Sequence, residues 1–174
     1  MIDLAAHIRD IPDYPKPGIL FKDITPLLLD PRALDQATRE LADWSRPREV
    51  DYVVAAEARG FILGTALALE LDAGFVPARK PGKLPHDTVA AEYILEYGVD
   101  ALEMHADALA HGARVLLHDD LLATGGTAKA LAELAEGRGA KIAGCAFLVE
   151  LAFLGGRETL AGYDVHSLIS YDGE

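Results

Sequence analysis

The sequence predicts an α/β fold with a doubly wound, mainly parallel sheet. Apolar runs at residues 50–57, 114–120 and 140–151 have the composition of strands buried on both faces. Between them lie stretches in which apolar residues recur every three or four positions, the spacing of helices that pack on a sheet. Strands that alternate with helices favour parallel pairing, because each helix returns the chain to the same edge.

Length and composition indicate one globular domain over residues 1–174, with 51% hydrophobic and 25% charged residues. A net charge of −12 argues against nucleic-acid binding, which depends on cations that contact phosphate. No apolar run approaches the roughly 20 residues that span a bilayer, and the N-terminus lacks a secretory pattern. Cys145 is the only cysteine, and the six histidines show no metal-ligand spacing. We therefore expect a cytoplasmic protein without a protein-held metal.

In the first half, residues 2–9 suit a short amphipathic helix, and Pro12, Pro15 and Pro17 then force an extended loop over 11–26. Residues 31–45 predict a helix that Asp30 caps, with Pro31 in its first turn. A strand over 50–57, a helix over 61–71 and a strand over 75–80 follow.

In the second half, Pro81, Gly82 and Pro85 predict a mobile loop, and residues 91–97 alternate as a strand. We expect a helix over 100–110, a central strand from 114, a helix that ends near 137 and a strand over 140–151. A helical turn over 155–160 and a short strand over 165–170 complete the chain.

The most informative stretch, residues 115–128, joins an apolar strand to a helix through two adjacent carboxylates and a glycine turn. Glycines let the backbone approach a ligand, and a helix N-terminus offers unpaired N–H groups to a phosphate. Asp119 and Asp120 suit hydroxyls or a cation, while Thr124 and Thr127 add donors. The stretch therefore predicts a ribose phosphate site. The alternative is that Thr124 only caps a helix and the aspartates end a solvated strand.

Two further groups of residues could bind a phosphorylated ligand. Arg59 lies at a second strand-to-helix turn, where a guanidinium can grip phosphate with two hydrogen bonds. A cluster of three cations within five residues stands out in this acidic chain: Arg79, Lys80 and Lys83. A lid that closes over a polyanion and excludes water requires such a cluster. The alternatives are a surface arginine and a solvated charge cluster. Phe21, in the proline-rich loop, is either packed on the body or a wall for a flat ligand.

Five motifs stand in the same order as in one known family: I-P-D-Y-P-K-P-G-I-L-F-K, E-A-R-G, R-K-P-G-K-L-P, L-E-Y-G and D-D-L-L-A-T-G-G-T. From about Ile8 to Tyr171 the chain resembles the adenine-specific branch of the type I phosphoribosyltransferases. The resemblance implies that fold, with a small N-terminal purine-binding segment and a flexible hood over about 80–92. It implies phosphoribosyl transfer from phosphoribosyl diphosphate (PRPP) to adenine, giving AMP and diphosphate, with Mg²⁺ held mainly by substrate, possibly near Asp119 and Asp120, and a homodimer.

The resemblance also implies a role for each matching residue. Phe21 would stack on the base while the backbones of Leu20 and Lys22 read its edge. Glu96 would be a candidate proton donor or acceptor for the purine, and Tyr97 would lie beside the reacting groups. Asp119 and Asp120 would bind the ribose. The 5′-phosphate would contact Ala123, Thr124, Gly125, Gly126 and Thr127. The diphosphate would contact Ala58 and Arg59, and also Arg79 and Lys83, of which some could be supplied across a dimer interface.

The resemblance also implies a strained or cis peptide near Glu57–Ala58–Arg59, and the chain departs from the family at one position. His118 stands where the family usually has an apolar residue, and strand alternation should turn its side chain away from the ligand.

Two other functions use the same fold. A PRPP-sensing regulator would need a nucleic-acid-binding appendage and a basic face, and neither is visible in the sequence. An enzyme for xanthine, hypoxanthine or orotate would share the phosphate turns, but the purine loop and L-E-Y-G favour adenine.

Overall fold

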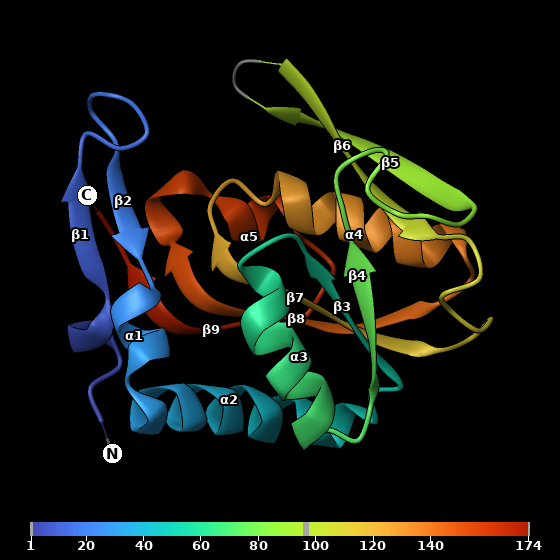
Figure 1. Ribbon diagram of the computed structural model, residues 1–174, viewed down its shortest axis with the longest axis horizontal. Coiled ribbons are helices and arrows are strands. Elements are labelled where there is room, and N and C mark those ends of the chain that lie inside the picture. The colour runs from blue at the N-terminus through green and yellow to red at the C-terminus, as the bar shows by residue number, and fades with distance from the viewer. Residues whose placement is uncertain (1, 96–97, 174) are drawn as a thin grey trace.

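The computed structural model describes residues 2–95 and 98–173, and the side chains within 94–99 are not described. A five-stranded sheet forms its centre, in the order β4-β3-β7-β8-β9 (Figure 1). These strands are β3 (Tyr52–Ala56), β4 (Gly74–Ala78), β7 (Arg114–Leu122), β8 (Lys141–Leu151) and β9 (Val165–Tyr171). Every neighbouring pair is parallel, which confirms the predicted doubly wound α/β architecture.

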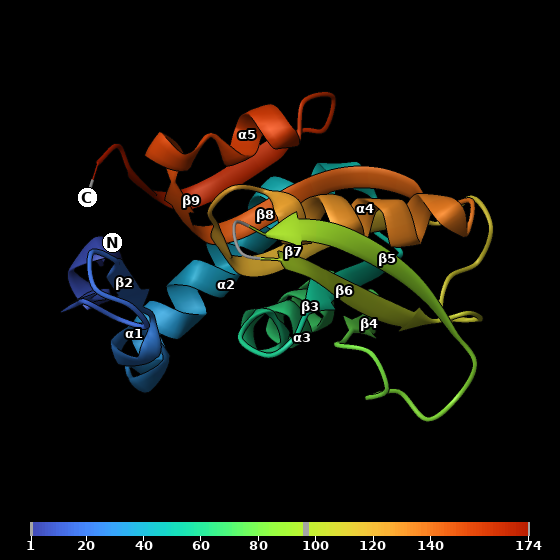
Figure 2. The ribbon, with the colours of Figure 1, turned by 90° about the horizontal axis from the view of Figure 1, so that it is seen from above.

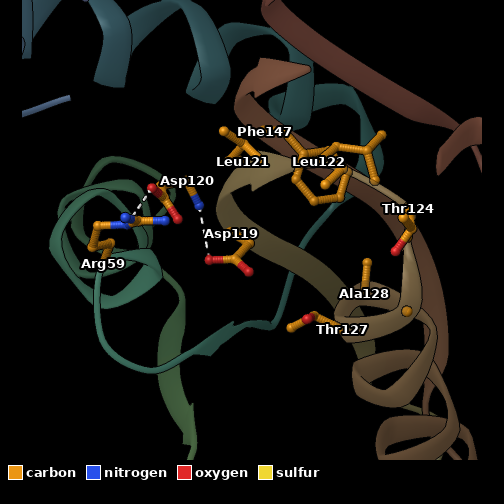
Figure 3. A pocket seen from close by; sticks show the side chains of 12 residues that line it. Arg59, Asp119, Asp120, Leu121, Leu122, Thr124, Thr127, Ala128 and Phe147 are labelled. Atoms are coloured by element: carbon orange, nitrogen blue, oxygen red, sulfur yellow. Dashed lines mark hydrogen bonds and ion pairs between the residues drawn. The ribbon is translucent and has the colours of Figure 1, made fainter. Parts of the chain in front are cut away.

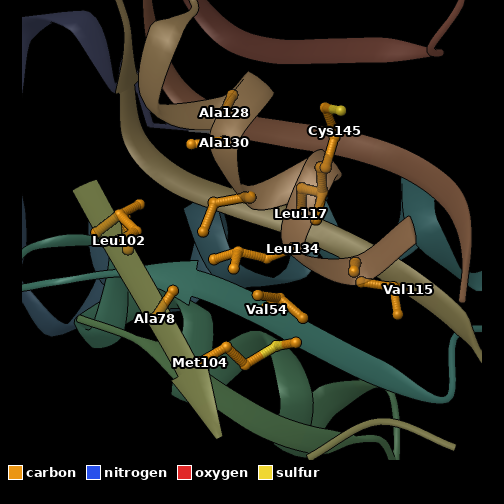
Figure 4. Close-up of a cluster of buried hydrophobic side chains, with 14 of the residues drawn as sticks. Val54, Ala78, Leu102, Met104, Val115, Leu117, Ala128, Ala130, Leu134 and Cys145 are labelled. Atoms are coloured by element: carbon orange, nitrogen blue, oxygen red, sulfur yellow. The ribbon is translucent and has the colours of Figure 1, made fainter. Parts of the chain in front are cut away.

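Helices cover both faces of the sheet (Figures 1 and 2). On one face lie α1 (Thr25–Leu29), α2 (Pro31–Ser45) and α3 (Gly60–Glu70), and on the other lies α4 (Gly126–Gly137). Adjacent residues of β3 divide between the two cores, because successive side chains of a strand point to opposite faces. Val53 packs in the cluster with Leu67 of α3, and Val54 packs in the cluster with Leu134 of α4 (Figure 4).

The predicted helix over 100–110 is wrong, because residues 98–105 form strand β6 (Gly98–His105). This strand pairs antiparallel with β5 (Thr88–Leu95), and the hairpin covers α4. Ala, Leu, Glu and Met favour helices, but Leu102 and Met104 are fully buried and alternate with the half-buried residues 101, 103 and 105. Burial of every second side chain, together with pairing to β5, therefore overrides the local helix preference.

The predicted helix over 2–9 is also wrong. Only a 3₁₀ turn, η1 (Ala5–His7), forms, and the chain then enters strand β1 (Arg9–Pro12), which pairs antiparallel with β2 (Leu20–Asp23). Leu4 is buried in the cluster that joins α1, α2 and β9, so tertiary packing fixes this segment. A second 3₁₀ turn, η2 (Arg46–Arg48), follows α2.

Several local predictions are confirmed. Helix α2 spans Pro31–Ser45, and the Asp30 carboxylate accepts hydrogen bonds from the Arg32 and Ala33 N–H groups at 2.9 and 3.3 Å. After β8 the chain forms η3 (Ala152–Leu154) and α5 (Gly156–Thr159) before β9. Within residues 2–95 and 98–173, none of the helices has the length and apolar character needed to cross a membrane.

Candidate active site

The turn Thr124–Thr127 at the end of β7, which we term the glycine turn, forms one wall of a cavity of about 210 Å³ (Figure 3). Strand β7 continues two residues beyond the acidic pair, to Leu122, and α4 begins at Gly126. Gly125 between them has φ +85°, a left-handed conformation that costs glycine nothing. The N–H groups of the first turn of α4 have no intrahelical partner, so they are free to bind an anion. The cavity is lined by Arg59, Phe147 and residues 119–128.

Two adjacent carboxylates form the floor of this cavity. The Asp120 N–H donates to Asp119 Oδ1 at 2.9 Å, and the Asp120 side chain is buried. Burial, followed by repulsion from Asp120, raises the pKa of Asp119 well above its ordinary value. Burial also raises the pKa of Asp120, against the opposing charge of Arg59. The pair therefore favours a ligand that brings hydroxyl donors or positive charge.

Arg59 connects the acidic pair with the N-terminal segment. Its Nε lies 2.7 Å from Asp120 Oδ2, and its guanidinium carbon lies 5.0 Å from the centre of the Phe21 ring. Figure 3 shows Asp119 between Arg59 and Thr127. The arginine precedes α3 in the E-A-R-G turn, where the Glu57–Ala58 peptide is cis, as expected. The next residue is Gly60, and a Cβ there would stand 2.7 Å from Asp119 Oδ1, so the Asp119 side chain would have to shift.

A second cavity, of about 360 Å³, adjoins the first and shares four of its lining residues. The shared residues are Arg59, Asp119, Asp120 and Thr127. Ala58 and Glu57 line its far side together with Lys80, Tyr93, Ala56 and Leu102. The acidic pair therefore stands between a glycine turn on one side and the E-A-R-G turn on the other. This arrangement suits a ligand that carries an anionic group at each end and hydroxyls between them.

Two of the three cations before the hairpin, Arg79 and Lys80, are already paired with carboxylates. Arg79 Nε donates to Glu57 Oε2 at 2.8 Å, and Lys80 Nζ contacts Asp100 and the Tyr93 hydroxyl. Burial works to raise the pKa of Glu57, but hydrogen bonds from the Lys80 N–H and Arg79 outweigh it and lower that pKa. Lys83 is exposed and outside both cavities, and its carbonyl accepts from Arg79 Nη1 at 3.1 Å. To bind these cations, an anionic ligand would have to replace Glu57 as the partner of Arg79, or Lys83 would have to move towards the ligand.

The residues predicted to bind the base lie on or after β2. The Phe21 ring faces Arg59 and meets Tyr14 edge to face at 5.1 Å. Leu20 is half-buried beside it. The Lys22 side chain is buried on the other face, where Nζ donates to Asp10 at 2.7 Å and lies over the Tyr171 ring. Only the backbone of Lys22 is therefore available to a ligand near Phe21. Glu96 and Tyr97 lie outside the described residues.

Sequence reasoning missed several residues that shape the cavities. Leu121, Leu122 and Phe147 line the first cavity, but apolar strand residues carry no signal that separates a cavity wall from core. Glu57 was seen only as part of a motif, yet it holds Arg79 and Lys80 in place. The Gly155–Gly156 pair could have indicated a close approach, and the turn it begins does pack against the glycine turn.

His118 lies away from the cavities, as strand alternation predicts. It is fully buried, its Nδ1 is 2.8 Å from the Ala146 carbonyl oxygen, and its ring reaches the backbone of Gly64 in α3. Burial lowers the pKa of His118 to about 4, against the hydrogen bond to Ala146. The imidazole is therefore neutral at pH 7, and Nδ1 is the nitrogen that carries the proton.

Comparison with known proteins agrees with this geometry. Residues 28–164 match the phosphoribosyl transferase domain. The chain belongs to the phosphoribosyltransferase family. Its sequence is 58% identical over 166 residues to the adenine phosphoribosyltransferase of Rubrobacter xylanophilus, an alignment that covers 95% of this chain and 90% of the relative. A second relative with the same name, from Rhodopirellula baltica, is 56% identical over 99% of this chain and 84% of its own. The crystal structure of the Thermoanaerobacter pseudethanolicus adenine phosphoribosyltransferase is 52% identical, with a TM-score of 0.95 over 97% of this chain and 98% of that one.

Proposed function

We infer that the two adjoining cavities are where the chain transfers the 5-phosphoribosyl group of PRPP to adenine, a reaction of purine salvage that gives AMP and diphosphate. The observation that carries this assignment is the position of Arg59. Its guanidinium contacts Asp120 at 2.7 Å and lies 5.0 Å from the Phe21 ring. The predicted sites for ribose, diphosphate and base therefore meet at one side chain.

The 5′-phosphate binds at the glycine turn and anchors the sugar. Residues Ala123 to Thr127 line the first cavity, and the N–H groups of the turn and of the first turn of α4 bind its oxygens together with the Thr124 and Thr127 hydroxyls. The 2′- and 3′-hydroxyls then donate to Asp119 and Asp120. As C1′ loses diphosphate, positive charge develops on the ring, and the two carboxylates below it stabilise that charge.

The leaving diphosphate occupies the second cavity, beside the backbone of Ala58 and the guanidinium of Arg59. Arg79 and Lys83 complete its binding when the segment over about 80–92 closes as a hood and excludes water. Arg59 then exchanges Asp120 for diphosphate, which frees that carboxylate for the ribose. Within residues 2–95 and 98–173, no cluster of three or more His, Cys, Asp or Glu could hold a metal.

Magnesium is the proposed cofactor, and the donors present fit it. Mg²⁺ prefers oxygen ligands and keeps several waters. Substrate oxygens and water would hold most of the ion, and the carboxylates of Asp119 and Asp120 would be the protein oxygens next to it. When bound, the ion neutralises charge on the diphosphate and makes it a better leaving group.

Adenine binds against Phe21, and the backbones of Leu20 and Lys22 read its edge. Such main-chain readout is consistent with the Lys22 side chain being buried on the opposite face. Glu96 accepts or donates the purine proton, and Tyr97 lies beside the reacting groups. An adenine phosphoribosyltransferase from Saccharomyces cerevisiae, 38% identical with a TM-score of 0.89 over 95% of this chain and 96% of its own, was crystallised with an imino-altritol bisphosphate and adenine.

We further propose that residues 1–174 act as one domain and that two chains form a homodimer in the cytoplasm. Helix α3 supports the dimer, because Ile62 and Leu69 are two turns apart on one face and are 46% and 79% exposed. A partner that covers this face would lie next to Arg59 and the E-A-R-G turn, at the start of the same helix.

An assay of single bases tests the assignment. The purified chain is incubated with PRPP, Mg²⁺ and, in turn, adenine, hypoxanthine, xanthine, guanine or orotate, and nucleotide formation is followed by chromatography. We expect AMP from adenine at a kcat/KM at least a hundredfold above that for any other base. Turnover of another base without AMP from adenine would overturn the substrate. Tight binding of PRPP without turnover of any base would instead favour a PRPP-sensing regulator.

A further inference from the structure

The segment 152–160, which comprises η3 and α5 and which we term the α5 turn, packs against the outer side of the glycine turn. Thr159 Oγ1 donates a hydrogen bond to the Thr124 carbonyl oxygen at 2.7 Å. A Cβ on Gly125 would stand 2.8 Å from the Gly156 carbonyl oxygen and 2.9 Å from Thr159 Cβ. A Cβ on Gly156 would in turn collide with the Ala123 carbonyl. Both segments therefore carry glycine where their backbones touch.

The hydrogen bond from Thr159 fixes the orientation of one peptide group. A trans peptide is planar, so the carbonyl of Thr124 and the N–H of Gly125 point in opposite directions. The carbonyl points outward to Thr159, and the N–H therefore points inward, to the side on which residues 123–128 line the first cavity. If the carbonyl were free to rotate, this donor would be lost to the cavity for part of the time.

The α5 turn is held in place without help from a ligand. Arg157 forms two hydrogen bonds with Glu150 at the end of β8, at 2.7 and 2.8 Å, and its Nη1 donates to the Val165 carbonyl of β9 at 2.8 Å. Glu150 is buried, and Leu160 at the end of the turn is fully buried. The Thr159 hydroxyl is thus presented from two strands of the central sheet and is preset before substrate arrives.

We propose that Thr159 is a positioning residue of the transfer reaction, which aims the Gly125 N–H at the 5′-phosphate through the Thr124 carbonyl. The proposal rests on the assignment of the glycine turn to the 5′-phosphate. Thr159 itself touches no substrate in this account. Loss of the Thr159 hydroxyl should therefore weaken the binding of every ligand that has a 5′-phosphate and should not affect the binding of any other ligand.

Thr159→Val tests the proposal, because it removes the hydroxyl and keeps the shape that packs on Gly125. A typical intramolecular hydrogen bond corresponds to a factor of about three to ten in an equilibrium constant. We expect the KM for PRPP and the Kd for AMP to rise by that factor, while the KM for adenine at saturating PRPP and the inhibition by diphosphate stay unchanged. Thr159→Ser should restore both values, because it returns the hydroxyl.

Two further variants separate the possible failures. Thr38→Val removes a hydroxyl that donates to a carbonyl at 2.8 Å inside α2, far from the cavities, and should leave every kinetic constant unchanged. Thr127→Val removes a donor from the cavity wall itself. If Thr127→Val weakens PRPP and AMP but Thr159→Val does not, the positioning role is wrong and the phosphate site stands. If neither variant weakens them, both are wrong. Equal losses for adenine and PRPP in Thr159→Val, with a lower unfolding temperature, would reduce Thr159 to a structural role.

Discussion

The buried imidazole of His118 predicts a specific loss of stability in mild acid. Its ring packs between β7 and α3 beside Gly64, and Nε2 is buried there without a hydrogen-bond partner among the described residues. Burial lowers the pKa of His118 from 6.5 to about 4, so the folded chain resists a proton that the unfolded chain accepts. The neutral ring therefore favours folding fully above pH 6.5, and this advantage is lost as the pH falls towards 4.

The size of the loss follows from the two pKa values. A shift from 6.5 to about 4 corresponds to roughly 3 kcal/mol once the pH is below both values. Between pH 7.5 and pH 5 the same linkage gives about 2 kcal/mol, or roughly a thirtyfold change in the unfolding equilibrium. Other groups that titrate in this range are common to the wild type and to a variant, so their contributions cancel in a difference.

Urea unfolding of the wild type and His118→Leu at pH 7.5, 6 and 5 measures this difference. Leucine suits the apolar surroundings and cannot bind a proton, so the stability advantage of the wild type should shrink by about 2 kcal/mol between pH 7.5 and 5. If the free energy of unfolding changed with pH by the same amount in the wild type and in His118→Leu, the reasoning would be refuted, because a buried neutral histidine must make the wild type lose more stability in acid.

Three further predictions concern the cavities. Arg59→Ala should lower kcat/KM for PRPP about a hundredfold with only a small change in unfolding temperature, and unchanged kinetics would remove Arg59 from the site. Asp119→Asn combined with Asp120→Asn should raise the KM for PRPP tenfold or more without loss of stability, because the repulsion that raises the Asp119 pKa disappears; survival of both rate and PRPP affinity would disprove the ribose assignment. Gly60→Ala should destabilise the fold by about 1–3 kcal/mol through its contact with Asp119, whereas Gly137→Ala, with open space around it, should not; equal unfolding temperatures for the two would contradict the steric argument.

Sequence reasoning predicted the parts of the fold that have a strong local signal. The capped helix after Asp30 and the buried strands carry their periodicity and caps in consecutive residues. Strand β6 has no such local signal, because Ala101, Leu102 and Glu103 are good helix formers and only pairing with β5 makes them a strand. The prediction for residues 2–9 was wrong for a similar reason, since β1 forms only by pairing with β2.

The candidate site shows the same division. The Thr124–Thr127 turn and the acidic pair could be predicted because the apolar strand, the two carboxylates, the glycines and the start of the helix follow one another within residues 115–128. The contact of Arg59 with Phe21 could not be predicted, because it joins residues 38 positions apart and depends on how β2 is placed relative to the E-A-R-G turn. Thr159 was invisible for a related reason: its role depends on a carbonyl 35 positions away.

The most direct measurement of the central claim is a crystal structure of the chain with AMP. We expect the 5′-phosphate on the N–H groups of residues 124–127, the ribose hydroxyls on Asp119 and Asp120, and the adenine ring against Phe21. A nucleotide bound elsewhere, or one with its phosphate on the glycine turn and its base remote from Phe21, would contradict the account.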